Sequence, residues 1–357
     1  MSFRRLGFAA AVVTLAFAAT ACPSGEDDES IVAQVIDRGT LRCGVNDSVP
    51  GFGVLEGDDY EGFDIDFCRA IAAAVLGNAD DVELTTIAAE QRFTSLQGGE
   101  IDVLSRNTTW TSSRDGSEGA AFAQTTFYDS QGMMVRADSP YQSLEDMDGT
   151  DICVLSGTTT ELNLATQFEQ RDLDFEALSF RDVEQIQRNF VQERCDAWTS
   201  DKSQLAGIRS NWPDNEGGPD SLRILDEDMS KEPLGPVVRD GDSDWYDAVN
   251  WTVIATIQAE EFGITSKNVD RMRRSNDAEI KRFLGGAVEA EEEGEEAAPF
   301  DPGLDLPEDF AYQVIKQVGN YGEIYNRNVG PGSPLELDRG LNDLWTKGGL
   351  HYAPPYR

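Results

Sequence analysis

The chain is poor in the residues that carry most metal, nucleic-acid and proton-transfer chemistry. Among 357 residues it has a single histidine, His351, and only 29 lysines and arginines against 66 aspartates and glutamates. Phosphate binding needs a basic surface, so a net charge of −37 makes nucleic acid a poor partner. No two cysteines are closely spaced, which argues against a zinc site. The sequence predicts no cofactor and no metal.

Long apolar runs are also scarce. The stretch Leu6 to Ala19 follows two arginines, is too short to span a bilayer comfortably and precedes two small residues, so we interpret residues 1–21 as a secretory signal peptide. Cys22 follows directly and resembles the lipidated first residue of bacterial lipoproteins. Residues 22–30 are acidic and lack apolar anchors, which predicts a linker. We therefore expect an extracytoplasmic protein, in the periplasm or on the outer face of the cytoplasmic membrane, anchored through Cys22.

Cysteine usage agrees with export. Apart from Cys22, the chain has Cys43, Cys68, Cys153 and Cys195, an even number suited to an oxidising compartment. Four cysteines allow three pairings, and the sequence does not choose among them. We favour the local pairs Cys43–Cys68 and Cys153–Cys195, with four buried free thiols as the alternative.

Length and charge set the scale of the fold. Without the signal peptide, about 335 residues remain, enough for two lobes, with 27 basic against 66 acidic residues. The acidic run at residues 289–296 is interpreted as a solvated loop. A calcium site there is a weak alternative, because the run lacks the spaced oxygen ligands of known calcium loops.

The pattern of apolar residues alternates between strand and helix periods, which predicts an α/β fold with parallel strands. Binding sites of such folds lie at the carboxyl ends of the strands. The predicted strands are 41–45, 82–87, 101–104, 132–136, 152–155, 176–180, 196–199 and 235–239. The predicted helical segments are 64–76, 91–97, 159–170, 183–193, 243–262 and most of 308–345.

Two polar loops follow predicted strands and could face one small ligand. Residues 102–114 supply an amide, several hydroxyls and Arg114, whose planar guanidinium can grip both oxygens of a carboxylate. Residues 156–161 form a second hydroxyl-rich turn, and Asp201 ends a third strand. The alternative is a pair of solvated loops, but their common position at strand ends favours a binding site.

Several longer stretches resemble the polar amino-acid family of substrate-binding proteins, solute-binding protein family 3. The likeness covers roughly residues 33–357 and is greatest to the branch that serves general L-amino-acid ABC transporters. The stretches that carry it are Gly62–Cys68, Asp102–Arg114, Gly157–Leu162, Lys231–Pro236, Lys316–Glu323 and Leu344–Leu350.

The resemblance implies a two-lobed fold of the periplasmic-binding-protein type II, with two crossover hinge strands. The crossings would fall near 132–137 and 234–239. Residues 31–133 and 238–357 would then form the first lobe, and residues 134–237 the second.

The same resemblance implies roles for individual residues. Arg114 matches the arginine that pairs with the ligand α-carboxylate, and Asp201 matches the acid that receives the α-ammonium. Asn107 and Thr109 match first-lobe positions that hydrogen-bond the backbone groups of the ligand.

Other positions carry over from the second lobe and from the side-chain pocket. Thr158 and Thr159 match a turn that donates to the carboxylate at a helix N-terminus, a place that attracts anions. Arg92 lies where acid-specific relatives read the ligand side chain, although an exposed helix residue is the alternative. Asn46 replaces a second arginine, which implies broader polar specificity. Phe52 is expected to replace a ring that stacks on the ligand in many relatives.

Two classes of function remain after this comparison. The leading one is a monomer that captures L-amino acids, acidic or polar ones and their amides above all, and delivers them to an ABC transporter permease. The alternative is a secreted lyase or dehydratase on the same fold, but the sequence shows no nucleophile motif and no positioned histidine. A sensory module is a third possibility, and it lacks an attached signalling segment.

Overall fold

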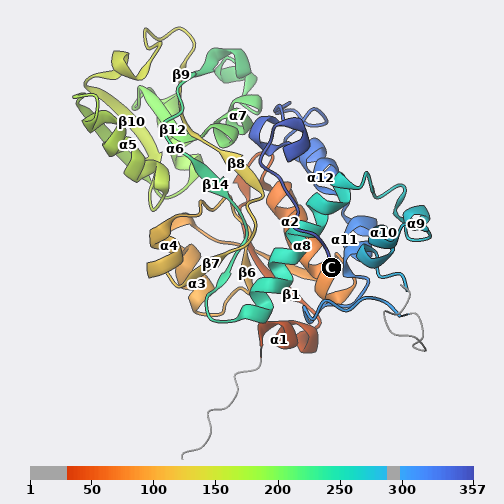
Figure 1. Ribbon diagram of the computed structural model, residues 1–357. Coiled ribbons are helices and arrows are strands. Elements are labelled where there is room, and N and C mark those ends of the chain that lie inside the picture. The colour runs from red at the N-terminus through yellow and green to blue at the C-terminus, as the bar shows by residue number, and fades with distance from the viewer. Residues whose placement is uncertain (1–29, 288–297) are drawn as a thin grey trace, which may run out of the picture.

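The computed structural model describes residues 30–287 and 298–357, which form two α/β lobes (Figure 1). Each lobe is built around its own five-stranded sheet. Two further strands run between the lobes, one in each direction of the chain. The two-lobed α/β architecture expected from the sequence is confirmed.

The first lobe contains both ends of the described chain. Its sheet has the order β5–β1–β6–β15–β7, with β1 parallel to β5 and β6 and with β15 antiparallel to β6 and β7. These strands are β1 (Leu41–Val45), β5 (Val82–Thr86), β6 (Val103–Leu104), β7 (Ala120–Phe122) and β15 (Val237–Arg239).

Helices of the first lobe pack around one long apolar helix. This helix, α2 (Phe63–Leu76), is buried along nearly its whole length, as its largely apolar, alanine-rich sequence requires. It packs against α8 (Ser243–Glu261) and α11 (Phe310–Gln317). The remaining elements are α1 (Ile31–Arg38), β2 (Ser48–Val49), β3 (Gly53–Glu56), β4 (Asp59–Glu61), α3 (Arg92–Gln97), α4 (Ser112–Ser117), α9 (Val269–Met272), α10 (Ala278–Phe283) and α12 (Tyr321–Asn328).

The second lobe repeats the alternation of strand and helix. Its sheet has the order β11–β10–β12–β9–β13, with β10 parallel to β11 and β12 and with β9 antiparallel to β12 and β13. The strands are β9 (Gln131–Arg136), β10 (Thr150–Leu155), β11 (Phe175–Phe180), β12 (Ala197–Asp201) and β13 (Leu222–Ile224). The helices are α5 (Thr159–Glu169), α6 (Val183–Val191) and α7 (Lys202–Ser210).

The hinge is a pair of antiparallel strands that lies earlier in the chain than the sequence predicted. β8 (Phe127–Asp129) pairs with β14 (Glu232–Leu234), and Asp129 lies directly opposite Glu232. The first crossing was expected near 132–137, but β9 already belongs to the second-lobe sheet. The correction has a simple cause, because an apolar pattern identifies a strand and does not say with which partner it pairs.

Both local disulfide pairings are confirmed. Cys43 in β1 is bonded to Cys68 in α2, which ties the first-lobe sheet to its central helix. Cys153 in β10 is bonded to Cys195, which lies just before β12. Each bridge therefore joins elements of one lobe, and neither restrains the hinge.

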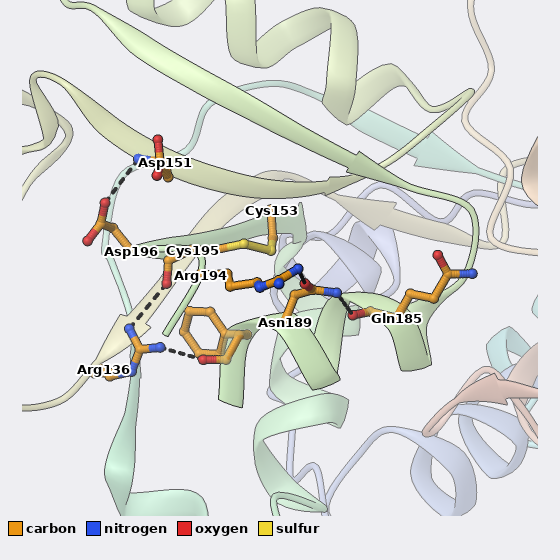
Figure 2. Close-up of a disulfide and its surroundings, with 9 residues drawn as sticks. Arg136, Asp151, Cys153, Gln185, Asn189, Arg194, Cys195 and Asp196 are labelled. Atoms are coloured by element: carbon orange, nitrogen blue, oxygen red, sulfur yellow. Dashed lines mark hydrogen bonds between the residues drawn. A yellow bond between two sulfur atoms is a disulfide. The ribbon is translucent and has the colours of Figure 1, made fainter. Parts of the chain in front are cut away.

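Figure 2 shows what surrounds the second disulfide. The Arg136 guanidinium donates to the backbone carbonyls of Phe190 and Cys195 and lies 4.6 Å from the centre of the Phe190 ring. On the other side, the Asp151 backbone N–H donates to the Asp196 carboxylate over 3.0 Å. These contacts fix the end of α6 and the entry to β12 relative to the sheet.

The C-terminal part departs from the helical pattern predicted for residues 308–345. After α12 the chain follows an irregular path to its end, with short 3-10 turns. Tyr321 Oη donates to the carbonyl of Thr126 over 2.8 Å, and the Asn342 side chain exchanges two hydrogen bonds with the backbone of Tyr128. These contacts attach the C-terminal segment to the hinge strand β8, a long-range interaction that a local pattern does not encode.

Some predictions lie outside the described residues. The signal peptide 1–21, Cys22 and all of the linker except Ser30 belong to this group, as does the acidic run at 289–296. Among the residues that the structure describes, no helix has the length and apolar character needed to cross a membrane. The same part of the chain contains no cluster of side chains suited to hold a metal ion.

Candidate functional site

A cavity of about 280 Å³ lies between the two lobes. It is lined by residues that follow the carboxyl ends of β1, β5, β6, β10 and β12. The strands of both sheets therefore end at the same cavity. Eight of the nine residues predicted to bind a ligand line this cavity: Asn46, Arg92, Asn107, Thr109, Arg114, Thr158, Thr159 and Asp201.

Arg114 enters the cavity from the first lobe. It lies in the short helix α4, whose N-cap Thr111 accepts a hydrogen bond from the Arg114 backbone N–H at 3.3 Å. The guanidinium donates through Nη1 to the carbonyl of Thr109 over 2.8 Å and lies 5.4 Å from the centre of the Phe93 ring. Burial lowers the pKa of Arg114, because a cation loses solvation there. Its Nε and Nη2 have no protein partner among the described residues, so both can donate hydrogen bonds to a bound anion.

Asn107 connects the first lobe to the carboxylate of Asp201 in the second. Its backbone has a φ of 28°, a left-handed conformation that asparagine tolerates better than most residues. Asn46 Nδ2 donates to Asn107 Oδ1 over 2.5 Å, and the Asp64 carboxylate accepts from the Asn107 backbone N–H at 2.7 Å. With its amide held in this way, Asn107 Nδ2 lies 3.3 Å from Asp201 Oδ2 and 3.4 Å from Gln204 Oε1.

Hydroxyl groups from both lobes meet at a buried hinge carboxylate. Glu232 Oε2 accepts from Thr109 Oγ1 at 2.5 Å and from Thr159 Oγ1 at 2.9 Å, and the two threonine oxygens are 3.3 Å apart. Thr158 caps α5 by accepting from the Glu161 backbone N–H. The predicted hydroxyl-rich loops therefore face each other, and the positive end of α5 points into the same cavity.

Arg92 is buried and bridges the lobes. Its Nε donates to the carbonyl of Ala89 over 2.9 Å within the first lobe, and its Nη2 donates to the carbonyl of Gly157 over 2.8 Å in the second. Burial, together with the charges of Arg114 and Arg106, holds the pKa of Arg92 well below its usual value. The alternative of an exposed helix residue is excluded, since only 3% of Arg92 is accessible.

Phe52 does not line the cavity, so its expected role as a ring that stacks on the ligand is not met. Only 1% of the residue is exposed, and its ring packs edge-on against Phe63 and Phe127. An aromatic side chain next to an apolar cluster gains more from burial there than from a solvated cavity. Val49, in the neighbouring strand β2, is the apolar residue that lines the cavity at this point.

Carboxylates near the hinge hold their protons more strongly than usual. Burial, followed by the charges of Asp129 and Glu232, raises the pKa of Asp201 well above 3.8. Burial also raises the pKa of Asp129 to about 6 and that of Asp64 to about 7. A cationic group placed beside Asp201 would relieve this cost by favouring the ionised form.

The site also contains three residues that were not predicted from the sequence: Arg106, Gln204 and Glu232. Arg106 and Gln204 line the cavity, and Glu232 lies in the hinge behind it. A signal for Arg106 was present, since it follows a predicted strand inside the loop 102–114. Glu232 could not be found in this way, because its contacts with Thr109 and Thr159 join segments far apart in the chain.

Hydrogen bonds to the protein hold the polar groups at the centre of the cavity in positions from which they can bind a ligand. Asn46 and Asn107 bond each other, Asn107 also bonds Asp201, and Arg114 bonds the carbonyl of Thr109. His351 is fully buried between the rings of Tyr128 and Tyr321 and does not line the cavity. Burial lowers the pKa of His351 to about 3.

The sequence profile of the bacterial extracellular solute-binding proteins, family 3, matches residues 41–267. The general L-amino acid-binding periplasmic protein AapJ of Rhizobium johnstonii is 47% identical over 91% of this chain and 92% of its own length. The glutamate/glutamine/aspartate/asparagine-binding protein BztA of Rhodobacter capsulatus is 42% identical over 95% of this chain and 97% of its own length.

A solved structure extends the likeness to three dimensions. A periplasmic binding protein from Brucella ovis with glutathione bound superposes with a TM-score of 0.86 and is 43% identical. The superposition covers 92% of this chain and 100% of the other.

Proposed function

This chain belongs to the bacterial extracellular solute-binding proteins of family 3, and from that membership and the geometry of the cavity we propose that it captures L-amino acids for an ABC transporter. The observation that carries the proposal is one cavity with a buried cation from one lobe and a buried anion from the other. Arg114 and Asp201 are these two groups. An α-amino acid carries the complementary pair of charges on neighbouring atoms.

We assign the α-carboxylate to Arg114 and the α-ammonium to Asp201. A planar guanidinium with two unused donor atoms suits a carboxylate, and Thr158 and Thr159 at the N-terminus of α5 add donors from the second lobe. The ammonium would replace Asn107 as the partner of Asp201, which leaves Asn107 and Thr109 to bind the backbone groups of the ligand. Each end of the ligand then contacts a different lobe.

The side chain of the ligand would lie among polar groups, which favours glutamate, glutamine, aspartate and asparagine over leucine or phenylalanine. Asn46 can donate to an acid and accept from an amide. Arg92 adds positive charge and joins the lobes through Gly157. An apolar side chain would desolvate these groups without giving them partners, which costs free energy.

Capture and delivery follow from two lobes on a two-stranded hinge. A ligand that contacts both lobes binds the closed form more strongly than an open one and shifts the population toward closure. The closed form is the one that a permease would recognise. Export through the signal peptide and tethering through Cys22 would place the monomer at the membrane surface.

An amino-acid lyase or dehydratase on this fold is the less favoured alternative. The matched relatives AapJ and BztA are named as binding proteins. A lyase needs a group that removes a proton from the ligand carbon. We assign the buried carboxylate of Asp201 to the ammonium instead, because its position opposite Arg114 fits that role.

A calorimetric titration of the purified mature protein with the twenty L-amino acids tests the proposal. We expect binding of polar and acidic amino acids, with no product formed during the titration. Glutathione belongs in the same panel, because it ends in a γ-glutamyl group with a free α-amino and α-carboxyl group. Failure of every amino acid to bind would refute the proposal, and conversion of a bound amino acid would favour the enzyme.

A further inference from the structure

We propose that Arg106 binds a second acidic group, in the side chain of the ligand. The protein would then bind an acidic amino acid, such as glutamate, more tightly than its amide, such as glutamine. The proposal rests on the proposed amino-acid binding and names a selectivity residue within that site. Arg106 follows β6, lines the cavity and is 8% exposed.

Cations outnumber anions among the buried residues that line the cavity. The buried ionisable residues that line it are Arg92, Arg106, Arg114 and Asp201, which makes three cations and one anion. A neutral zwitterion uses Arg114 and Asp201 and leaves Arg92 and Arg106 without an ion-pair partner among the described residues. Buried charges are costly when unpaired, so the cavity is complementary to a ligand with an additional negative charge.

Arg106 and Arg92 differ in how many of their guanidinium nitrogens bond to the protein. Arg92 directs two of its nitrogen atoms to backbone carbonyls, one in each lobe. Arg106 directs only Nε to a backbone carbonyl, that of Ile87, over 2.6 Å. Within the described residues its two terminal nitrogen atoms, Nη1 and Nη2, have no protein partner. Arg106 therefore has two terminal nitrogens available to donate parallel hydrogen bonds to the two oxygens of a carboxylate.

Within residues 30–287 and 298–357, no protein carboxylate neutralises Arg106 by direct contact. Asp64 and Asp47 act on it electrostatically, but neither forms an ion pair with it among the described residues. Asp64 accepts instead from the Asn107 backbone N–H. The guanidinium is held in place at Nε while its outer edge remains available to a ligand.

The test compares the acid and the amide of one ligand pair in an Arg106→Gln variant. Glutamate and glutamine differ only in the group that Arg106 is proposed to contact. A hydrogen bond to a charged group corresponds to a change in affinity of about tenfold to a hundredfold. We expect the ratio of the glutamine to the glutamate dissociation constant to fall by about tenfold or more in the variant. Titration with alanine, which lacks the distal group, should show nearly unchanged affinity.

Arg181→Gln is the matched control, because Arg181 also lines the cavity but is exposed. It removes the same charge, and we expect it to leave the glutamine-to-glutamate ratio unchanged. Arg106→Lys provides a second variant that keeps the charge and loses the planar fork, and it should lower the ratio by less than Arg106→Gln. An unchanged ratio in both Arg106 variants, or an equal fall in Arg181→Gln, overturns the role of Arg106. Failure of wild-type protein to bind any amino acid overturns the proposed function as well.

Discussion

At the scale of single residues, the site combines side chains that are costly to bury with contacts that hold them ready for a ligand. Arg114 is anchored by one hydrogen bond to the carbonyl of Thr109, and Asp201 is contacted by Asn107 across the cavity. Burial lowers the pKa of Arg114 and raises the pKa of Asp201, so it favours the neutral form of each side chain. A zwitterionic ligand would reverse both pKa shifts, because it places an opposite charge beside each side chain. The site should therefore select ligands that carry both charges.

Arg114→Ala should nearly abolish amino-acid binding and leave the fold intact. Truncating one member of a buried charge pair costs about 2–5 kcal/mol of binding free energy, part of which is the penalty for a ligand carboxylate left unpaired. The ligand-free variant should unfold at a temperature no lower than that of the wild type, because a buried cation without an ion pair is removed. Calorimetry and thermal unfolding measure the two quantities. Near-normal affinity would refute the assignment of Arg114.

Ligand affinity should increase with pH because of Asp201. Burial, with the charges of Asp129 and Glu232, raises its pKa above 3.8 in the ligand-free protein, and an ammonium beside it would lower that pKa again. Binding should therefore release a proton at pH values between the two pKa values, and affinity should rise as the pH increases through that range. Calorimetry in two buffers with different ionisation enthalpies counts the released protons. Asp201→Asn should release fewer, and the same release in that variant would contradict the assignment.

Residue identities could be predicted from the sequence where local position was enough. Thr109, Arg114, Thr158 and Thr159 lie in hydroxyl-rich loops after predicted strands, and all four line the cavity. Phe52 could not be placed, because its burial depends on Phe63 and Phe127 from other elements.

At the scale of elements, the two lobes approach each other so closely that helix α7 has no room for a side chain at one position of their contact. Gly207 lies in α7 of the second lobe, and a Cβ atom built there would be 2.5 Å from the carbonyl oxygen of Pro50 in the first lobe. This contact lies outside the ligand groups discussed above and exists only when the lobes are together. We infer from this contact that α7 limits how far the lobes can close.

Gly207→Ala should weaken ligand binding without destabilising the protein. Alanine favours a helix over glycine by about 0.5–1 kcal/mol, whereas overpacking against Pro50 costs about 1–3 kcal/mol in the closed form. The ligand-free variant should therefore unfold at an equal or higher temperature while its affinity for glutamate falls. Gly116→Ala in α4 is the control, because nothing lies within 4 Å of its added Cβ. Unchanged affinity in Gly207→Ala would show that α7 does not limit closure.

Most strands and helices could be predicted from apolar periodicity, and their pairing could not. β1 and β10 agree with the sequence prediction within two residues at each end. The hinge strands β8 and β14 were placed too late, because three-residue strands carry little periodic signal and are defined by each other. Beyond residue 328 the irregular path depends on hydrogen bonds to β8 rather than on a local pattern.

At the scale of the whole molecule, a strongly acidic chain encloses a cavity with an excess of buried cations. The chain has 66 acidic and 29 basic residues, yet three of the four buried ionisable residues that line the cavity are arginines. The acidic exterior favours solubility and repels free anions at long range. The proposed selectivity for anionic side chains would therefore arise at short range, inside the cavity between the lobes.

Closure couples the two lobes through contacts that a ligand would complete. Arg92 to Gly157 and Thr109 to Thr159 already join the lobes directly. A ligand held by Arg114 and Asp201 would add a further bridge between them. We propose that both charged ends of the amino acid are needed to make this bridge.

The most direct test compares the affinity of L-glutamate with that of glutarate, its analogue without the α-amino group, by calorimetry on wild-type protein. Glutarate keeps both carboxylates, so it can still contact the arginines, but it leaves Asp201 without an ammonium. Loss of this charged contact predicts binding that is weaker by about tenfold to a hundredfold or more. Equal affinity for glutamate and glutarate would contradict the account.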